Sequence, residues 1–265
     1  MYNLTPSMNL FHRDLGGGGL PPLVVLHGLL GSSRNWQAAG RDLSAGFHVL
    51  APDLRNHGSS PHSGTMTYEA MAGDVLDWME AQGLGRAAML GHSMGGKVAM
   101  LLACRHPGRV ERLVVVDIAP KDYFWPERRV ELAALRDIDL GTLASRAEAE
   151  RLIEARVPDW GLRKFLLTNL DRGEGGGWRW LANLPVLTGA LGSLERNPLG
   201  EGDRFPGPSL FIAGGGSPYV LPGDHAAIVH HFPEAAIRTI PGAGHNLHME
   251  ARHELVGLVR STFST

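Results

Sequence analysis

One pentapeptide, Gly91-His92-Ser93-Met94-Gly95, constrains the fold of this chain more than any other stretch. A short apolar run, Ala87 to Leu90, precedes it, and a helix-like run, Lys97 to Ala103, follows it. A serine between a strand and a helix sits on a sharp turn, where flanking glycines remove side chains that would clash. The pattern predicts a turn that raises the Ser93 hydroxyl above a sheet as a nucleophile. The alternative is an ordinary glycine-rich turn that happens to contain serine.

Strand-like and helix-like segments alternate along most of the chain. Continuous apolar runs, such as Leu23 to Leu26 and Leu113 to Val116, are typical of parallel strands covered on both faces. Thr67 to Gln82 has the apolar spacing of an amphipathic helix. This alternation predicts an α/β fold with a mostly parallel central sheet flanked by helices. Near the N-terminus we expect an edge strand over Met8 to His12 and a hairpin turn over residues 16–19.

The rhythm changes between residues 121 and 205, where no strand-like apolar run appears. Helices are expected there over 127–135, 145–155, 162–170 and 178–191. Strand character resumes over Ser209 to Ala213, and Asp224 is expected to cap the helix that follows. We therefore expect residues 1–120 and 206–265 to form the α/β core, and residues 121–205 to be a helical cap inserted over one end of the sheet.

A serine nucleophile needs a base within hydrogen-bond reach and a group that orients that base. Among the 13 histidines, His245 is the best candidate, because it follows the last predicted strand in a glycine-rich loop. Serine, acid and histidine is also the chain order expected for this type of turn. His27 and His57 lie at strand ends, where shaping a pocket is the simpler role. Helix-surface or packing positions are expected for His230, His231, His248 and His253.

Asp117 is the predicted acid. It ends the strand that follows the serine turn, so it should lie beside Ser93 on the same rim of the sheet. The usual alternative position, after the next strand, holds Ser217 and no carboxylate before Asp224. Ser217 can form a hydrogen bond but cannot supply charge, and losing that charge in a comparable triad costs about 10⁴ in turnover. We therefore expect Ser217 to support Asp117. A helix-capping or loop-closing role is the alternative for Asp117.

Acyl transfer also needs N–H donors for the oxyanion that develops on the substrate. The amide of Met94, directly after the nucleophile, is one expected donor. The loop after the second strand, His27-Gly28-Leu29-Leu30-Gly31, is the expected source of the other, and Leu29 is the natural residue. Without the serine turn, this loop would simply be a tight turn.

These motifs together resemble the α/β-hydrolase superfamily over essentially the whole chain. Asp53 to Ser59, Val116 to Pro120 and Gly214 to Val220 are similar to the small bacterial acyl esterases of the YbfF type. The resemblance implies hydrolysis of esters or thioesters. It also implies that Asp117 is the acid, that Ser217 occupies the position where the acid usually stands, and that a helical cap covers the site.

Aromatic residues gather within the expected cap. They could line an acyl pocket, because ligand sites are typically apolar clefts with few polar groups. The alternative is that they belong to ordinary cap packing. Together with a histidine from the oxyanion loop, the candidate substrate contacts are His27, Tyr123, Trp125, Trp178 and Trp180.

The sequence thus predicts a serine esterase or thioesterase that works through an acyl-enzyme on Ser93. Acyl transfer or perhydrolysis, in which another nucleophile replaces water, is the alternative reaction, and a ligand sensor is the non-enzymatic alternative. The chemistry requires no metal or organic cofactor.

Composition limits the partners. A formal net charge of −2 gives no electrostatic reason to expect a nucleic-acid partner. No run approaches about 18 apolar residues, so no membrane span is expected. With no secretory signal in the sequence, we expect a cytoplasmic protein that acts on a small-molecule acyl ester or thioester. The oligomeric state has no sequence signature here.

Overall fold

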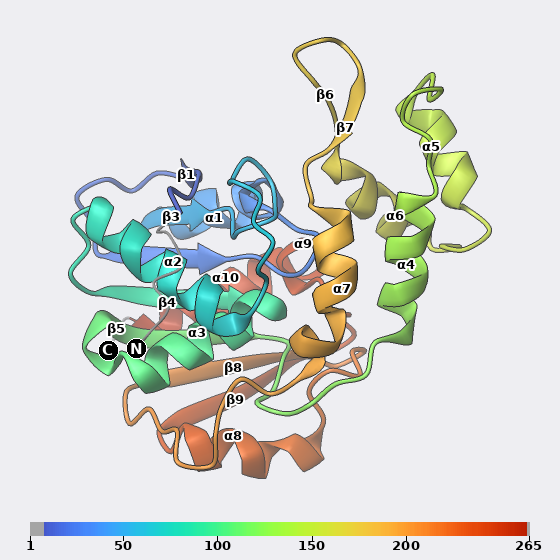
Figure 1. Ribbon diagram of the computed structural model, residues 1–265. Coiled ribbons are helices and arrows are strands. Elements are labelled where there is room, and N and C mark those ends of the chain that lie inside the picture. Colours follow the sequence, from blue (N-terminus) through green and yellow to red (C-terminus); the bar gives the residue numbers. More distant parts are fainter. Residues whose placement is uncertain (1–7, 264–265) are drawn as a thin grey trace.

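A seven-stranded sheet forms the centre of the computed structural model, which describes residues 8–263 (Figure 1). In spatial order β1-β3-β2-β4-β5-β8-β9, every neighbouring pair is parallel except β1 with β3. The strands are β1 (His12–Asp14), β2 (Pro22–Leu26), β3 (His48–Pro52), β4 (Ala87–His92), β5 (Val110–Val116), β8 (Ser209–Gly214) and β9 (Ala235–Ile240). The predicted parallel α/β sheet is confirmed, and β4 lies at its centre with every residue buried.

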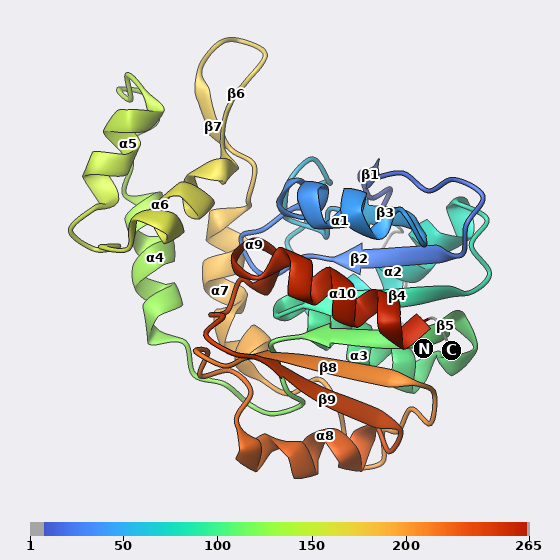
Figure 2. The ribbon, with the colours of Figure 1, turned by 180° about the vertical axis from the view of Figure 1, so that it is seen from behind.

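Helices cover both faces of the sheet, which explains the continuous apolar runs. Val24 and Leu26 of β2 join the core cluster on one face, whereas Leu23 and Val25 join the cluster on the other. Figures 1 and 2 show the two layers from opposite sides. One layer holds α2 (Tyr68–Ala81), α3 (Met94–Arg105) and α8 (His225–His231); the other holds α1 (Gln37–Leu43) and α10 (Arg252–Phe263). No helix within residues 8–263 is long and apolar enough to cross a membrane.

Helix α2 forms where the sequence predicts it. The Thr67 hydroxyl caps its first turn by accepting the Ala70 N–H at 3.2 Å. Met71, Val75 and Trp78 recur at helical spacing and are buried against the core. The helix ends before Gly83, whose φ of 69° favours glycine.

The chain between β5 and β8 lies beyond the carboxyl ends of the sheet strands (Figure 1). Residues 121–205 are called the cap below. Its elements are α4 (Pro126–Arg136), α5 (Arg146–Ile153), α6 (Trp160–Leu166), η3 (Leu167–Asn169), β6 (Leu170–Arg172), β7 (Trp178–Trp180) and α7 (Leu184–Glu195). Short helices elsewhere are η1 (Ser33–Trp36), η2 (Pro107–Arg109), η4 (Pro222–Asp224) and α9 (Leu247–Glu250).

The N-terminal strand differs from the prediction. It begins at His12 rather than ending there, because Leu10 is drawn into the core instead of alternating along a strand. β1 pairs antiparallel with β3, and the Leu15 N–H continues that pairing to the Val49 carbonyl at 2.9 Å. Residues 16–19 therefore connect strands that are not neighbours, and the expected hairpin turn is wrong.

A helix over 178–191 is also wrong. Trp178 to Trp180 alternate aromatic and charged residues and form β7, which pairs antiparallel with β6 as a small hairpin. α7 begins only at Leu184, where Pro185 suits the first turn of a helix. Likewise, the expected helix over 162–170 is displaced, because Asp159 caps α6 by accepting the Leu162 N–H at 2.6 Å.

Asp224 does not cap α8 with its side chain, contrary to the prediction. Its carboxylate instead accepts the Leu221 N–H at 2.8 Å and pairs with the Lys121 ammonium at 2.7 Å. Asp224 therefore stabilises its own turn and joins it to the start of the cap.

Candidate active site

The turn between β4 and α3 holds Ser93 in a conformation that few non-glycine residues adopt, with φ of 52° and ψ of −118°. The two glycines of the pentapeptide make this turn possible. A Cβ on Gly91 would lie 2.3 Å from the Gly95 carbonyl oxygen, and one on Gly95 would lie 2.4 Å from the Leu26 carbonyl oxygen. The chain packs too tightly there for any side chain, as the sequence predicts.

Ser93, His245 and Asp117 form one hydrogen-bonded chain. The Ser93 hydroxyl lies 3.0 Å from His245 Nε2, and His245 Nδ1 lies 2.8 Å from Asp117 Oδ2. A proton on Nδ1 donated to Asp117 leaves Nε2 free to accept from Ser93. The three side chains come from the β4–α3 turn, the loop after β9 and the end of β5, so the carboxyl edge of the sheet brings them together.

Asp117 is fully buried and held on both carboxylate oxygens. Oδ1 accepts the Gly214 N–H at 2.9 Å, while Oδ2 accepts the Ser217 hydroxyl as well as His245. Ser217 thus contacts the acid. Asp117 also has a positive φ of 49°, fixed by its N–H bond to the Ile212 carbonyl at 2.8 Å. This backbone turn aims the carboxylate across the sheet edge toward His245.

Burial lowers the pKa of His245 below its usual value, against the opposing hydrogen bond and charge of Asp117. The positive charge of Arg128 acts in the same direction as burial. The imidazole is therefore neutral at neutral pH, which is the form that can accept the serine proton.

Two backbone amides near Ser93 are free within the described part of the chain: Leu29 lies on the loop after β2 and borders the cavity at Ser93, and Met94 is the first residue of α3. Within residues 8–263, neither the Leu29 N–H nor the Met94 N–H has a protein acceptor. Neighbouring groups fix the loop: His57 Nε2 accepts the Leu30 N–H at 3.2 Å, and Asn169 of the cap donates to the Leu30 carbonyl at 2.7 Å. Leu29 and Met94 thus have the free donors that an oxyanion requires.

His27 is occupied by its own backbone surroundings. Its Nδ1 donates to the Gly28 carbonyl at 2.8 Å, and its Nε2 accepts the Leu54 N–H at 2.9 Å. The side chain is 1% exposed. His27 borders the cavity at Ser93, but with both nitrogens engaged it holds the oxyanion loop and has none left for a substrate.

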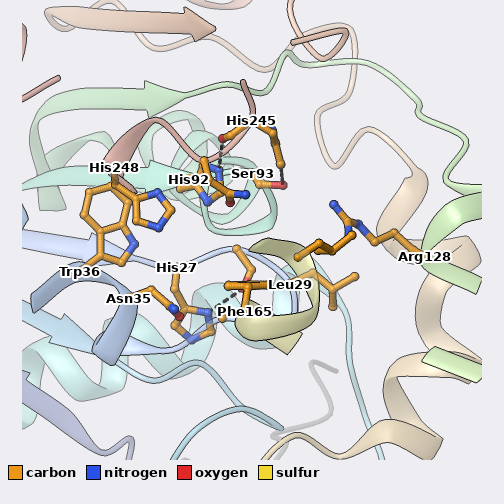
Figure 3. A pocket seen from close by; sticks show the side chains of 14 residues that line it. His27, Leu29, Asn35, Trp36, His92, Ser93, Arg128, Phe165, His245 and His248 are labelled. Atoms are coloured by element: carbon orange, nitrogen blue, oxygen red, sulfur yellow. Dashed lines mark hydrogen bonds between the residues drawn. The ribbon is translucent and has the colours of Figure 1, made fainter. Parts of the chain in front are cut away.

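Two neighbouring spaces lie at this end of the sheet, and the smaller one borders Ser93. A cavity of about 30 Å³, enough for a water molecule or two, is bordered by Ser93, Leu29 and His245 (Figure 3). A larger cleft of about 430 Å³ opens next to it beneath the cap. Arg128 and Leu162 border both. The remaining walls of the cleft are Tyr123, Phe124, Trp125, Glu127, Glu131, Pro218 and Tyr219.

The structure separates the aromatic residues that the sequence grouped together. Tyr123 and Trp125 line the cleft. Trp178 and Trp180 instead lie on the β6–β7 hairpin and border neither space, so the structure does not bring them to the site. Trp178 donates to the Leu143 carbonyl at 2.7 Å, and the Arg172 guanidinium lies 3.8 Å from its ring. Their contacts are those of ordinary cap packing.

Tyr219 and Arg128 are site residues that sequence reasoning missed. The Tyr219 ring stacks on the His245 imidazole, with centroids 3.8 Å apart and planes 15° apart. Arg128 projects from the cap toward Ser93 and His245 (Figure 3), and bonds Glu131 and the Tyr219 phenol. Tyr219 lies within a stretch that resembles YbfF-type esterases, which was a usable signal. Arg128 sits on an ordinary amphipathic helix and gave none.

His248 is a buried packing residue rather than a helix-surface residue, and it lies at the cavity. It is buried, borders the cavity at Ser93 and stacks on Trp36 with centroids 4.6 Å apart. Within residues 8–263, neither of its ring nitrogens has a hydrogen-bond partner. Burial lowers the pKa of His248 to about 3, so the ring is neutral.

Comparisons with known proteins bear on the family and the fold of the chain. Residues 21–137 match the family model of the alpha/beta hydrolase fold. The chain is 39% identical over 263 residues to the sn-1-specific diacylglycerol lipase ABHD11 of Mus musculus, covering 96% of this chain and 84% of that protein. It is 35% identical over 242 residues to Esterase YbfF of Escherichia coli (strain K12), covering 90% and 91%. The solved structure of a marine microorganism esterase matches with a TM-score of 0.94 at 36% identity, covering 97% of this chain and all 100% of that one.

Proposed function

This chain belongs to the α/β-hydrolase family and is an ester hydrolase, and on that premise we propose that Ser93 is its nucleophile, His245 its general base and Asp117 the acid that orients His245. The observation that carries the proposal is the continuous chain from Ser93 Oγ to His245 Nε2 (3.0 Å) and from His245 Nδ1 to Asp117 (2.8 Å).

The reaction begins when Ser93 Oγ attacks the acyl carbon and His245 Nε2 takes its proton. Asp117 stabilises the resulting imidazolium. The carbonyl oxygen of the substrate becomes an oxyanion, and the free amides of Leu29 and Met94 bind it; one such donor is worth about 10²–10³ in rate. His245 then protonates the departing alcohol or thiol, which leaves an acyl-enzyme. Water, deprotonated by His245, attacks the acyl carbon and releases the acid together with free Ser93.

The cleft beside Ser93 suits an acyl chain. Six of its nine lining residues are aromatic or aliphatic, among them Tyr123, Trp125 and Tyr219, and the other three are charged. A small cavity at the nucleophile and a larger apolar cleft next to it match a scissile carbonyl with an attached apolar group. Residues 121–205 act as the cap that encloses this group over the core formed by 1–120 and 206–265. Thioesters fit the same machinery, because a thiolate is a good leaving group. A cytoplasmic location remains an expectation from the sequence.

A panel of p-nitrophenyl esters of increasing chain length, with matching acyl-CoA thioesters, tests the proposal. We expect turnover of short and medium acyl esters by the wild type and loss of at least about 10³ in kcat for Ser93→Ala. Adding ethanol as a second acceptor separates hydrolysis from acyl transfer, because transfer yields the ethyl ester. No turnover of any ester would remove the enzymatic proposal and favour the ligand-sensing alternative.

A further inference from the structure

A lysine ammonium is buried where the cap meets the nucleophile helix. Lys97 lies one turn into α3, and its N–H donates to the Ser93 carbonyl at 3.1 Å. The side chain is 0% exposed and does not border the cavity at Ser93. No step of the reaction above uses it, although burying an ammonium is costly unless its donors are satisfied.

The Lys97 ammonium binds the end of α7, where the cap returns to the core. Nζ donates to three successive backbone carbonyls, Leu194 (3.5 Å), Glu195 (3.1 Å) and Arg196 (2.6 Å). The last carbonyls of a helix lack partners within the helix, and the helix dipole makes this end negative. Lys97 therefore satisfies the returning connection by hydrogen bonding, and by charge in its protonated form, since burial lowers the pKa of Lys97 to about 7.

The same ammonium lies against the connection that leads from the core into the cap. It is 4.9 Å from the Tyr123 ring centroid and 5.6 Å from that of Trp125, within the range of cation–π attraction. The two connections also bind each other, because the Tyr123 N–H donates to the Glu195 carbonyl at 2.8 Å. Lys97 thus contacts both the connection that enters the cap (residues 118–125) and the connection that returns from it (residues 194–199).

Tyr123 and Trp125 also line the cleft beneath the cap. Tyr123 stacks on Trp125 and on Tyr219, each with centroids 5.6 Å apart, and Tyr219 stacks on His245. A shift of Tyr123 or Trp125 would therefore change the width of the cleft.

We propose that Lys97 is a positioning residue for acyl-chain selectivity, because it fastens both cap connections to the helix that begins at Ser93 and so fixes the aromatic wall of the cleft. The inference rests on the proposed function in one respect, namely that the cleft receives the acyl chain. It differs from a purely structural role in what it predicts: the effect grows with the length of the acyl chain.

The test compares Lys97→Met with wild type on p-nitrophenyl acetate and p-nitrophenyl octanoate. The ratio of kcat/KM for octanoate to that for acetate should fall about tenfold, mainly through the octanoate KM. Lys164→Met is the control, because Lys164, on the cap helix α6, likewise lies over an aromatic ring, Trp160, but contacts neither connection. Its ratio should stay within about twofold of wild type.

Lys97→Met should fold, since the Leu194 carbonyl keeps the Tyr68 hydroxyl as a donor and the Glu195 carbonyl keeps the Tyr123 N–H. Should it not accumulate as folded protein, Lys97→Gln keeps an amide NH₂ group that can donate and should lower the ratio about threefold. A ratio within about twofold of wild type in the folded variant would overturn the proposal.

Amide hydrogen exchange provides a readout that needs no substrate. In Lys97→Met, residues 118–125 and 194–199 should exchange about tenfold faster, with no such change in Lys164→Met. Unchanged exchange in both connections would show that Lys97 does not fasten them. Absence of ester turnover in the wild type would instead count against the proposed function and would leave this exchange result intact.

Discussion

At the scale of single residues, backbone strain gathers around Ser93. Residues 8–263 contain four non-glycine residues with positive φ, and three of them, Leu30, Ser93 and Asp117, border or support the site. Each such residue costs about 1–3 kcal/mol unless its surroundings hold it in place. The strain orients the oxyanion loop, the hydroxyl and the carboxylate, so stability is given up where geometry matters to the chemistry.

Exchanging Asp117 for asparagine tests the acid. Asp117→Asn keeps the shape but removes the charge, so kcat should fall by about 10³–10⁴. Ser217→Ala removes one bond to the carboxylate and should cost about tenfold. Asp224→Asn is the control, because its carboxylate binds a turn and Lys121 outside the triad, and its kcat should remain near that of wild type. Near wild-type turnover by Asp117→Asn would refute the assignment.

The stack of Tyr219 on His245 should appear in the pH profile. Because burial lowers the pKa of His245, kcat/KM of the wild type should fall only below about pH 6.5. Tyr219→Leu removes the ring and admits water, so the acid limb should move up toward about pH 6.5. Tyr219→Phe keeps the stack and is the control, with an unmoved limb. If the acid limb of the kcat/KM profile lies at the same pH in all three proteins, Tyr219 does not lower the pKa of His245.

The sequence was sufficient to predict residues whose position follows from strand order. Ser93, Asp117 and His245 each follow a strand of the sheet, so a correct list of strands brings them to one edge. Tyr219, Arg128 and His248 depend instead on contacts across the fold, such as the stack on His245 or on Trp36. No local pattern encodes such contacts.

At the scale of elements, length decided which predictions held. The buried strands and α2 carry periodic signals over several residues and are confirmed. β6 and β7 span three residues each, and the alternating Trp178-Arg179-Trp180 is too short to separate from an adjoining helix by pattern alone. The hairpin is stabilised by pairing between the two strands, and a pattern within either strand alone does not reveal that pairing.

Substituting the cap tryptophans tests whether Trp125, and not Trp178, lines the acyl cleft. Trp178→Ala should leave the octanoate KM within about twofold of wild type, because Trp178 lies on the hairpin and borders neither space at the site. Trp125→Ala removes a wall of the cleft and should raise that KM about tenfold. Steady-state kinetics on p-nitrophenyl octanoate measures both values, and equal effects of the two substitutions would contradict the structural distinction.

At the scale of the whole molecule, alternating strands and helices predict the core, but they do not predict how the cap is seated. Seating depends on contacts between distant residues, such as Asn169 with the Leu30 carbonyl and the Asn183 N–H with the Asn56 carbonyl. Lys97 adds a further such contact, to the Arg196 carbonyl at the end of the cap. These are side-chain or loop bonds with no periodic signature.

Buried neutral histidines should make stability depend on pH. Burial lowers the pKa of both His57 and His248 to about 3, so between about pH 3 and 6.5 the unfolded chain binds protons that the folded chain does not. The free energy of unfolding should therefore fall as the pH drops through this range.

His248→Phe isolates one of these contributions. It keeps a ring against Trp36 and loses no hydrogen bond found within residues 8–263. Below about pH 6, the slope of unfolding free energy against pH should decrease by about 1.4 kcal/mol per pH unit. Urea unfolding at a series of pH values measures this slope, and parallel curves for variant and wild type would contradict a neutral buried His248.

The central claim is that one serine, Ser93, carries the acyl group. Titration of the wild type with a fluorophosphonate, followed by peptide mass spectrometry, tests it most directly. We expect one label per chain, located on Ser93, with ester hydrolysis lost in proportion to labelling and no labelling of His245→Ala on the same timescale. Hydrolysis that persists in fully labelled protein, or a label on any other residue, would contradict the claim.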